Sequence, residues 1–156
     1  MQLTEAIKKG ENVLKKISPF IVRGRLAGSI RRKKPIVKDI DIVVEIKLDN
    51  LEDLKNSLFE LGEIKLKGEK LVRIIAEDNT QIEIYIGNKE NYEPLLLIRT
   101  GSKEHNIKLT TKAISLGMKL TANGLIDIET NSIIATSEKD IFKALNLPYL
   151  EPEKRI

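Results

Sequence analysis

The sequence predicts an α+β fold in which a mixed sheet with flanking helices is followed by a small α/β unit. Two observations lead to this prediction: apolar residues recur at helical spacing in several segments, and short β-branched runs bounded by turn residues lie between them. The 156 residues are 41% hydrophobic but only 4% aromatic, so the core must consist mostly of Ile, Leu and Val. We expect a first unit over 1–90 and a second over 91–156.

The first unit is expected to begin with a helix over 4–17, with Thr4 as its N-cap and a Ser-Pro pair at its end. A sharp turn at Gly28-Ser29 should lead into a short basic helix. The strands are expected over 20–27, 39–46, 63–67, 71–76 and 81–86, with a further helix over 51–61.

The second unit is expected to start with two helices, over 93–99 and 103–116, the latter stopped by Gly117. Short strands are expected over 118–121, 124–129 and 132–135. Ser137 should cap a last helix that runs through Leu145, and two prolines keep the tail from continuing that helix.

The composition excludes some classes of site and location. The chain has no cysteine, which rules out a disulfide scaffold and thiolate metal sites. No stretch is apolar enough to cross a bilayer and the first residues lack a signal-peptide core, so we expect a cytoplasmic protein without a membrane partner. The formal net charge is +4, and one short stretch holds Arg23, Arg25, Arg31, Arg32, Lys33, Lys34 and Lys38. Such a cluster indicates either phosphate binding or a solvated basic loop.

Two aspartates interrupt an otherwise apolar strand in the segment DIDIVVEI. Residues i and i+2 of a strand point to the same face, so Asp39 and Asp41 should project together. Neighbouring carboxylates repel each other and are costly to desolvate unless a cation bridges them, and oxygen ligands alone favour a hard ion such as Mg²⁺. The alternative is an exposed strand start in which Asp39 serves only as a turn residue.

A third carboxylate, Glu83, lies in the middle of the later strand QIEIYIG. If the two strands are neighbours, Glu83 completes a three-carboxylate cluster that can hold two Mg²⁺ ions about 4 Å apart, the arrangement used for in-line phosphoryl transfer. The alternative for Glu83 is a strand-edge residue that faces water.

The Gly28-Ser29 turn lies upstream of these aspartates, where a strand passes into the basic helix. A glycine lets the backbone approach a phosphate, and a helix N-terminus supplies free N–H donors. Arg31 and Arg32 follow, and a guanidinium can bind phosphate oxygens through two hydrogen bonds. A Gly-Ser pair alone is a weak signal, but with arginine and two aspartates about ten residues later it predicts a triphosphate site.

The series GS-x-RR then DIDIVV resembles the nucleotidyltransferase signature of the family X DNA polymerases, the group that includes DNA polymerase beta. The segments RTGSKEHN, MKLTANGL and SEKDIFKALNLPYLEPEKR are similar to later segments of that family, in the same order. The resemblance covers most of the chain from about Phe20 onward. It implies a nucleotidyltransferase palm followed by a small C-terminal nucleotide-binding subdomain.

The resemblance implies a template-directed DNA polymerase that adds deoxynucleotides to a 3′-hydroxyl, with gap filling in DNA repair as its expected task. The implied catalytic and metal-binding residues are Asp39, Asp41 and Glu83, and the implied nucleotide-binding residues are Gly28, Ser29, Arg32, Thr100, Gly101, Ser102 and Asn106. The implied cofactor is a pair of Mg²⁺ ions, with Mn²⁺ as a substitute. Expected partners are gapped or primer-template DNA, a deoxynucleoside triphosphate and a repair protein, and the chain is expected to be a monomer.

Several features depart from the family pattern. No sign of the usual N-terminal lyase domain or helix-hairpin-helix subdomain is found, so we expect a minimal form with palm and C-terminal subdomain only. Glu83 stands where Asp is usual, and Gln81 stands where the best-known members have an arginine that touches primer phosphate. Ile98 and Arg99 replace aromatic residues that pack against the sugar, which leaves the sugar selectivity open.

Two other functions stay open on the sequence alone. The same chemistry could serve a non-polymerase nucleotidyltransferase that acts on RNA or protein. The changes at Glu83 and Gln81 could instead mark a catalytically weak module that binds gapped DNA. His105, the only histidine, is expected on the helix surface or near DNA, without a chemical role.

Overall fold

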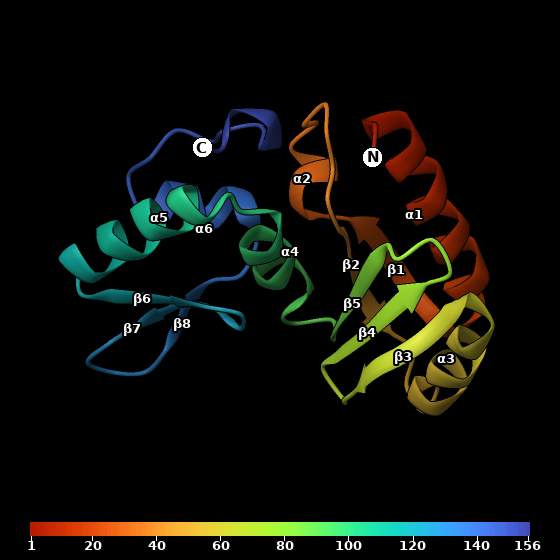
Figure 1. The fold of residues 1–156 in the computed structure, drawn as a ribbon. Coiled ribbons are helices and arrows are strands. Elements are labelled where there is room, and N and C mark those ends of the chain that lie inside the picture. Colours follow the sequence, from red (N-terminus) through yellow and green to blue (C-terminus); the bar gives the residue numbers. More distant parts are fainter.

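A computed structural model describes all 156 residues and shows two lobes, each built on its own sheet (Figure 1). The larger lobe has a five-stranded sheet in the order β1-β2-β5-β4-β3, and the smaller lobe has a three-stranded sheet in the order β6-β7-β8. The predicted α+β class is confirmed. None of the helices combines the length and the hydropathy that crossing a membrane would require.

The larger lobe contains α1 (Leu3–Ile17), β1 (Ile21–Leu26), α2 (Gly28–Arg31), β2 (Ile40–Ile46), α3 (Leu51–Ser57), β3 (Gly62–Lys67), β4 (Leu71–Ala76) and β5 (Gln81–Gly87). Strands β2 and β5 are parallel, and the other neighbouring pairs are antiparallel. The predicted cap of α1 is wrong, because Gln2 occupies the N-cap position and its side chain makes no capping hydrogen bond. The helix expected over 51–61 is α-helical only to Ser57 and continues as a 3₁₀ turn.

The two faces of the larger sheet pack against different parts of the protein. One face packs against α1 and α3 in a cluster of 16 buried residues that includes Ile42, Ile84 and Leu54. Because side chains alternate along a strand, the opposite face presents Val43 and Tyr85, which pack in a separate cluster with residues of α4. Asp41 and Glu83 belong to this second face. The sheet therefore directs its carboxylates toward the smaller lobe.

The smaller lobe contains α4 (Tyr92–Thr100), α5 (Lys103–Ser115), β6 (Met118–Thr121), β7 (Gly124–Asp127), β8 (Ile133–Ala135), α6 (Glu138–Ala144) and a 3₁₀ turn (Pro152–Lys154). Its core of nine buried residues includes Leu97, Leu109 and Phe142. The predicted cap of α6 is confirmed, because the Ser137 hydroxyl accepts the N–H of Asp140 at 3.1 Å.

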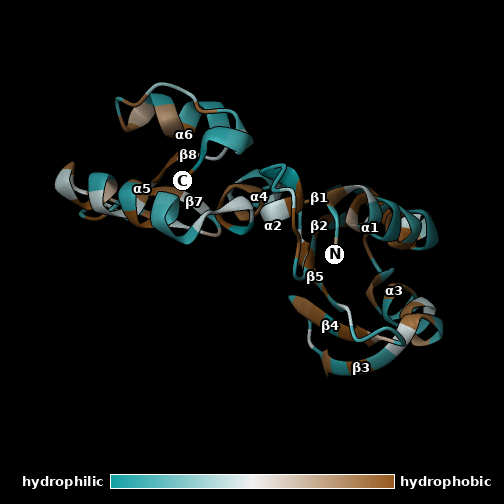
Figure 2. Cartoon of the chain, turned by 45° about the horizontal axis from the view of Figure 1, so that its top comes forward, coloured by the Kyte–Doolittle hydropathy of each residue, from teal (hydrophilic) through white to brown (hydrophobic).

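Helix α4 lies between the two lobes, beside α2 (Figures 1 and 2). Figure 2 also shows that β4 is largely hydrophobic, whereas β3 and α1 carry many hydrophilic residues. Helix α4 contributes Leu97 to the core of the smaller lobe and Leu95 and Leu96 to the cluster beneath the larger sheet. The same helix thus packs into both lobes.

Candidate active site

Asp41 and Glu83 lie on adjacent strands, and Asp39 comes just before the first of these strands. Strands β2 and β5 pair in parallel, and the register places Asp41 directly across from Glu83. Asp39 lies one residue before β2 begins and is half-buried. The condition that the two strands be neighbours is therefore met. Glu83 is on an interior strand with a side chain only 12% exposed, so the alternative of a strand-edge residue facing water is wrong.

The three carboxylates do not converge on one point. No group of three or more His, Cys, Asp and Glu side chains is close enough together to hold a metal ion. Three neighbouring donors contact Glu83. Its Oε1 accepts a hydrogen bond from Gln81 Nε2 at 2.7 Å, and its Oε2 accepts from the Tyr85 hydroxyl at 3.1 Å and from Arg73 Nη2 at 3.2 Å. The expected three-carboxylate cluster is therefore not assembled here, and the Glu83 carboxylate is bound by protein donors.

The Asp41 carboxylate makes no side-chain hydrogen bond and no ion pair and is surrounded by negative charge. Burial raises its pKa to about 6, with further contributions from the negative charges of Glu83 and Asp39, against smaller opposing effects of Arg99 and Arg32. This excess of negative charge and the all-oxygen donor set suit a hard divalent cation. The donor chemistry of these carboxylates thus fits such an ion.

Gly28 has a structural role at the start of α2. Its φ is +55°, and a Cβ atom at this position would collide with the carboxylate of Asp41. The preceding N–H, of Ala27, donates to the carbonyl of Asp41 at 2.8 Å. Glycine is needed here because α2 begins against the aspartate. Ser29 follows it and is half-buried.

The two arginines of the turn have unlike surroundings. Arg31 makes two hydrogen bonds to the Glu138 carboxylate, at 2.6 and 2.9 Å, and Arg155 donates to the same group at 2.8 Å. All three side chains are at most 8% exposed. Arg31 therefore joins the two lobes, and the expectation that it binds phosphate is wrong. Arg32 is half-buried, and its Nη1 donates to the carbonyl of Thr100 at 2.6 Å.

The predicted nucleotide-binding residues after α4 form a tight turn. The buried Thr100 hydroxyl donates to a carbonyl of its own helix at 2.6 Å, and the Ser102 hydroxyl caps α5 by accepting an N–H at 3.2 Å. Asn106 Nδ2 donates to the carbonyl of Ile98 at 2.9 Å, and its buried Oδ1 has no partner. Gly101 has a φ of +63°. The two hydroxyls thus shape the turn, whereas Asn106 keeps an unused acceptor.

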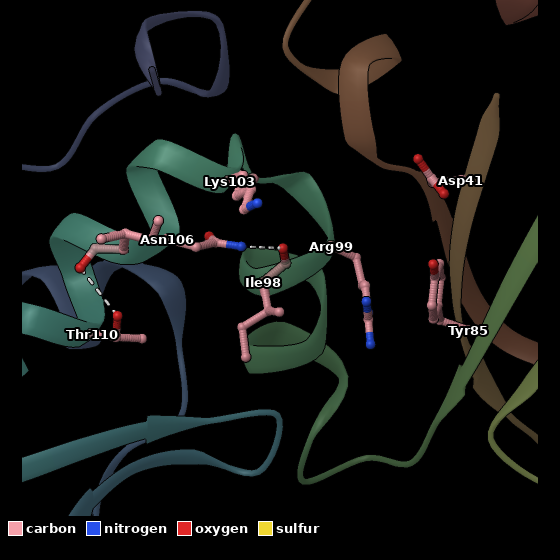
Figure 3. A pocket seen from close by; sticks show the side chains of 9 residues that line it. Asp41, Tyr85, Ile98, Arg99, Lys103, Asn106 and Thr110 are labelled. Carbon is pink, nitrogen blue, oxygen red and sulfur yellow. Dashed lines mark hydrogen bonds between the residues drawn. The ribbon is translucent and has the colours of Figure 1, made fainter. Parts of the chain in front are cut away.

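A cavity of about 480 Å³ lies between this turn and the larger sheet (Figure 3). Of the predicted site residues, Asp41, Gly101 and Asn106 line it, and the others lie outside its wall. Figure 3 shows Arg99 reaching from α4 toward Tyr85, and the guanidinium carbon lies 4.2 Å from the centre of the tyrosine ring. Arg99 is exposed and lines this cavity.

The sequence led us to expect His105 on the helix surface or near DNA, but the structure buries it. Its side chain is only 3% exposed, with its ring centre 5.7 Å from that of Phe142. Burial lowers its pKa to about 4, and the positive charges of Arg155 and Lys108 add to the effect. The position was misjudged because a histidine in a polar helical segment was assumed to face water.

Sequence reasoning missed the residues that support the site. Tyr85 could have been found, because it lies two residues after Glu83 on the same face of the strand. Arg73 is separated from Glu83 by ten residues, and only the β4–β5 register brings the two together. Glu138 and Arg155 carry no local signal that would link them to Arg31.

Comparisons with known proteins agree with this arrangement. The family model described as DNA polymerase beta thumb matches residues 95–156. The chain is 30% identical over 158 residues to DNA polymerase/3′-5′ exonuclease PolX of Bacillus subtilis (strain 168) and 29% identical over 175 residues to DNA polymerase IV of Saccharomyces cerevisiae. These alignments cover 96% and 99% of this chain but 27% and 29% of the relatives, so the chain spans less than a third of their length.

Solved structures of low sequence identity share the fold. Polymerase beta of Leishmania infantum, in a ternary P/T complex and in a ternary gap complex, matches with a TM-score of 0.87 and 19% identity in each case. The matches cover 100% and 99% of this chain and 76% and 70% of the compared chains.

The fold is thus the one seen in polymerase beta of Leishmania infantum, and the residues from Leu95 onward match the polymerase beta thumb model. In sequence, the chain is similar to part of the two DNA polymerases named above.

Proposed function

We propose that the chain is a template-directed DNA polymerase that adds a deoxynucleotide to a 3′-hydroxyl, with gap filling as its task. One observation carries the proposal: the parallel pairing of β2 and β5 sets Asp41 beside Glu83, and Asp41 lines the cavity that faces the turn after α4. The DNA polymerase names of the relatives support the same function.

Each residue has a separate part in this proposal. Asp39 and Asp41 would hold two Mg²⁺ ions, and Glu83 would hold one of them and accept a proton from the hydroxyl. The bound ions would make that hydroxyl more acidic and neutralise charge on the triphosphate. Arg32, whose buried Nε has no partner, would bind a triphosphate oxygen. Asn106 would offer its free Oδ1 to the nucleotide.

We further propose that the substrate is gapped or primer-template DNA together with a deoxynucleoside triphosphate. The related polymerase beta structures, described as ternary P/T and gap complexes, support DNA binding. The repair-protein partner, the monomeric state, the cytoplasmic location and the use of Mn²⁺ stay predictions from the sequence.

The test is incorporation of one nucleotide into a duplex with a one-nucleotide gap, at low salt and with Mg²⁺. We expect extension that follows the template base and is lost in Asp39→Ala and Asp41→Ala. Circular dichroism and thermal unfolding should show that both variants are folded. Full activity in either variant would overturn the assignment of these ligands.

One observation favours a catalytically weak module that binds gapped DNA without turnover: Glu83 is held by three protein donors, and no group of three carboxylates able to hold a metal ion is assembled. That alternative predicts Mg²⁺-dependent binding of gapped DNA with no product. Glu83→Asp distinguishes the two cases, because a shorter side chain would escape its donors and gain activity only if the rest of the site is competent.

A further inference from the structure

Glu83 is held by residues from two strands. The β4–β5 register places Arg73 directly across from Glu83, and Gln81 and Tyr85 flank it on its own strand. We infer that Arg73 competes with a divalent cation for the Glu83 carboxylate, so that Arg73 is a positioning residue that decides when the third ligand is available. The inference rests on the proposed metal site and concerns a residue outside it.

The geometry leaves Glu83 little freedom while Arg73 is bound. A carboxylate has about four acceptor directions, and three of them are occupied by Gln81, Tyr85 and Arg73. Gln81 and Tyr85 are uncharged donors, whereas Arg73 is the one cation that touches the group. Its contact is therefore the one that a second cation would oppose most strongly.

Electrostatics makes the competition direct. A divalent cation and a guanidinium repel each other, and both are attracted to the Glu83 carboxylate, whose Oε2 now accepts from Arg73. The Glu83 side chain is 12% exposed and that of Arg73 is 38% exposed, so the arginine can move into solvent while the carboxylate stays beside Asp41. Binding of the ion would release Arg73 from the Glu83 carboxylate.

The donors that hold Glu83 are also in contact with α4. Tyr85, which donates to Glu83 at 3.1 Å, has its ring beneath the guanidinium of Arg99 on α4, 4.2 Å from the ring centre. Tyr85 and Arg99 both line the cavity that Asp41 lines (Figure 3). The position of Glu83 is therefore linked to the position of α4.

The inference is tested by measuring Mn²⁺ binding to the full chain by electron paramagnetic resonance, without nucleotide or DNA. Arg73→Met keeps the length of the side chain and removes its charge. We expect its Mn²⁺ affinity to rise about three- to tenfold, as suits the loss of one charge-assisted contact and one nearby positive charge. Lys70→Met, which removes the same charge from a neighbouring exposed position without a contact to Glu83, should change the affinity much less.

A double-mutant cycle separates this inference from the proposed function. The gain of Arg73→Met should vanish in the Glu83→Gln background, because the competition needs the carboxylate. An unchanged or weaker affinity in Arg73→Met, or an equal gain in both backgrounds, would overturn the inference. Asp41→Asn is the reference for the site itself: if it does not weaken Mn²⁺ binding, the proposed metal site fails, whereas a weakening there without a gain in Arg73→Met refutes the role of Arg73 alone.

Discussion

Two carboxylates near the boundary between the lobes have opposite surroundings. Glu138 receives hydrogen bonds from Arg31 and Arg155, and although burial opposes its ionisation, the two arginines lower its pKa below the usual range. Asp41 has no side-chain hydrogen bond, and burial together with Glu83 and Asp39 raises its pKa to about 6. A carboxylate that the fold neutralises serves the structure, and one that the fold leaves charged and unpaired is available to a ligand.

The largest expected effect is at the neutralised carboxylate. Glu138→Gln leaves Arg31 and Arg155 buried without their counter-charge, and breaking a buried ion pair costs about 3–5 kcal/mol. Urea unfolding should show this loss. The control is Glu153→Gln, which removes an exposed partner of Lys33 and should have little effect. Similar losses in both variants would show that the Glu138 network is not a structural clamp.

Substitution of the unpaired carboxylate, Asp41, is expected to raise stability rather than lower it. In Asp41→Asn the charge that burial disfavours is gone, so without divalent ions the melting temperature at pH 7–8 should rise by about 2–6 °C. The sign follows from linkage: the folded pKa of about 6 lies above the ordinary 3.8, so the folded state binds more protons and the wild type loses stability as pH rises through this window. The gain should therefore vanish below about pH 4.

Measuring the melting temperatures of wild type and Asp41→Asn with added Mg²⁺ extends this test. The ion should stabilise the wild type by mass action and should stabilise Asp41→Asn much less. Asp49→Asn, an exposed aspartate just after β2, serves as the control and should show neither effect. A melting temperature of Asp41→Asn below that of the wild type at pH 8 would mean that the Asp41 carboxylate has a stabilising partner inside the protein. Asp41 would then be a paired carboxylate like Glu138.

The elements were predictable from the sequence because their signals are local. Each strand of the larger sheet was expected within two residues of its observed bounds, and Asp39 and Asp41 flank the first residue of β2. That Glu83 lies across from Asp41 could not be predicted from the sequence, which left open whether the two strands are neighbours. The contacts that each side chain makes were harder to predict from the sequence.

The failures share one physical cause, which is that a partner far along the chain decides the role of a side chain. Arg31 was expected to bind phosphate, but Glu138, 107 residues later, takes its donors. Glu83 was expected to complete a cluster with the aspartates, but Arg73 on the neighbouring strand donates to its carboxylate. A sequence reports which groups are present, whereas only the register and the packing of the lobes show which of them are already paired.

The smallest expected effect concerns a third kind of buried group, one that the fold keeps neutral. Burial lowers the pKa of His105 to about 4, below the ordinary 6.5, so the unfolded chain binds more protons and stability is lost as pH falls from about 6.5 toward 4. His105→Phe should remove this loss, which is at most about 1.4 kcal/mol per pH unit. A neighbouring apolar cavity of about 360 Å³, lined in part by His105 and Phe142, leaves room for the larger ring.

The measurement is the difference in unfolding free energy between His105→Phe and the wild type across pH 4–7. The difference must be used because Asp41 contributes a slope of opposite sign in the same pH range, and that contribution is common to both proteins. We expect the variant to gain steadily as pH falls below 6.5. Parallel curves would show that His105 accepts a proton in the folded state, which would require a partner for its unpaired Nδ1 and would place it with Glu138 among the neutralised groups.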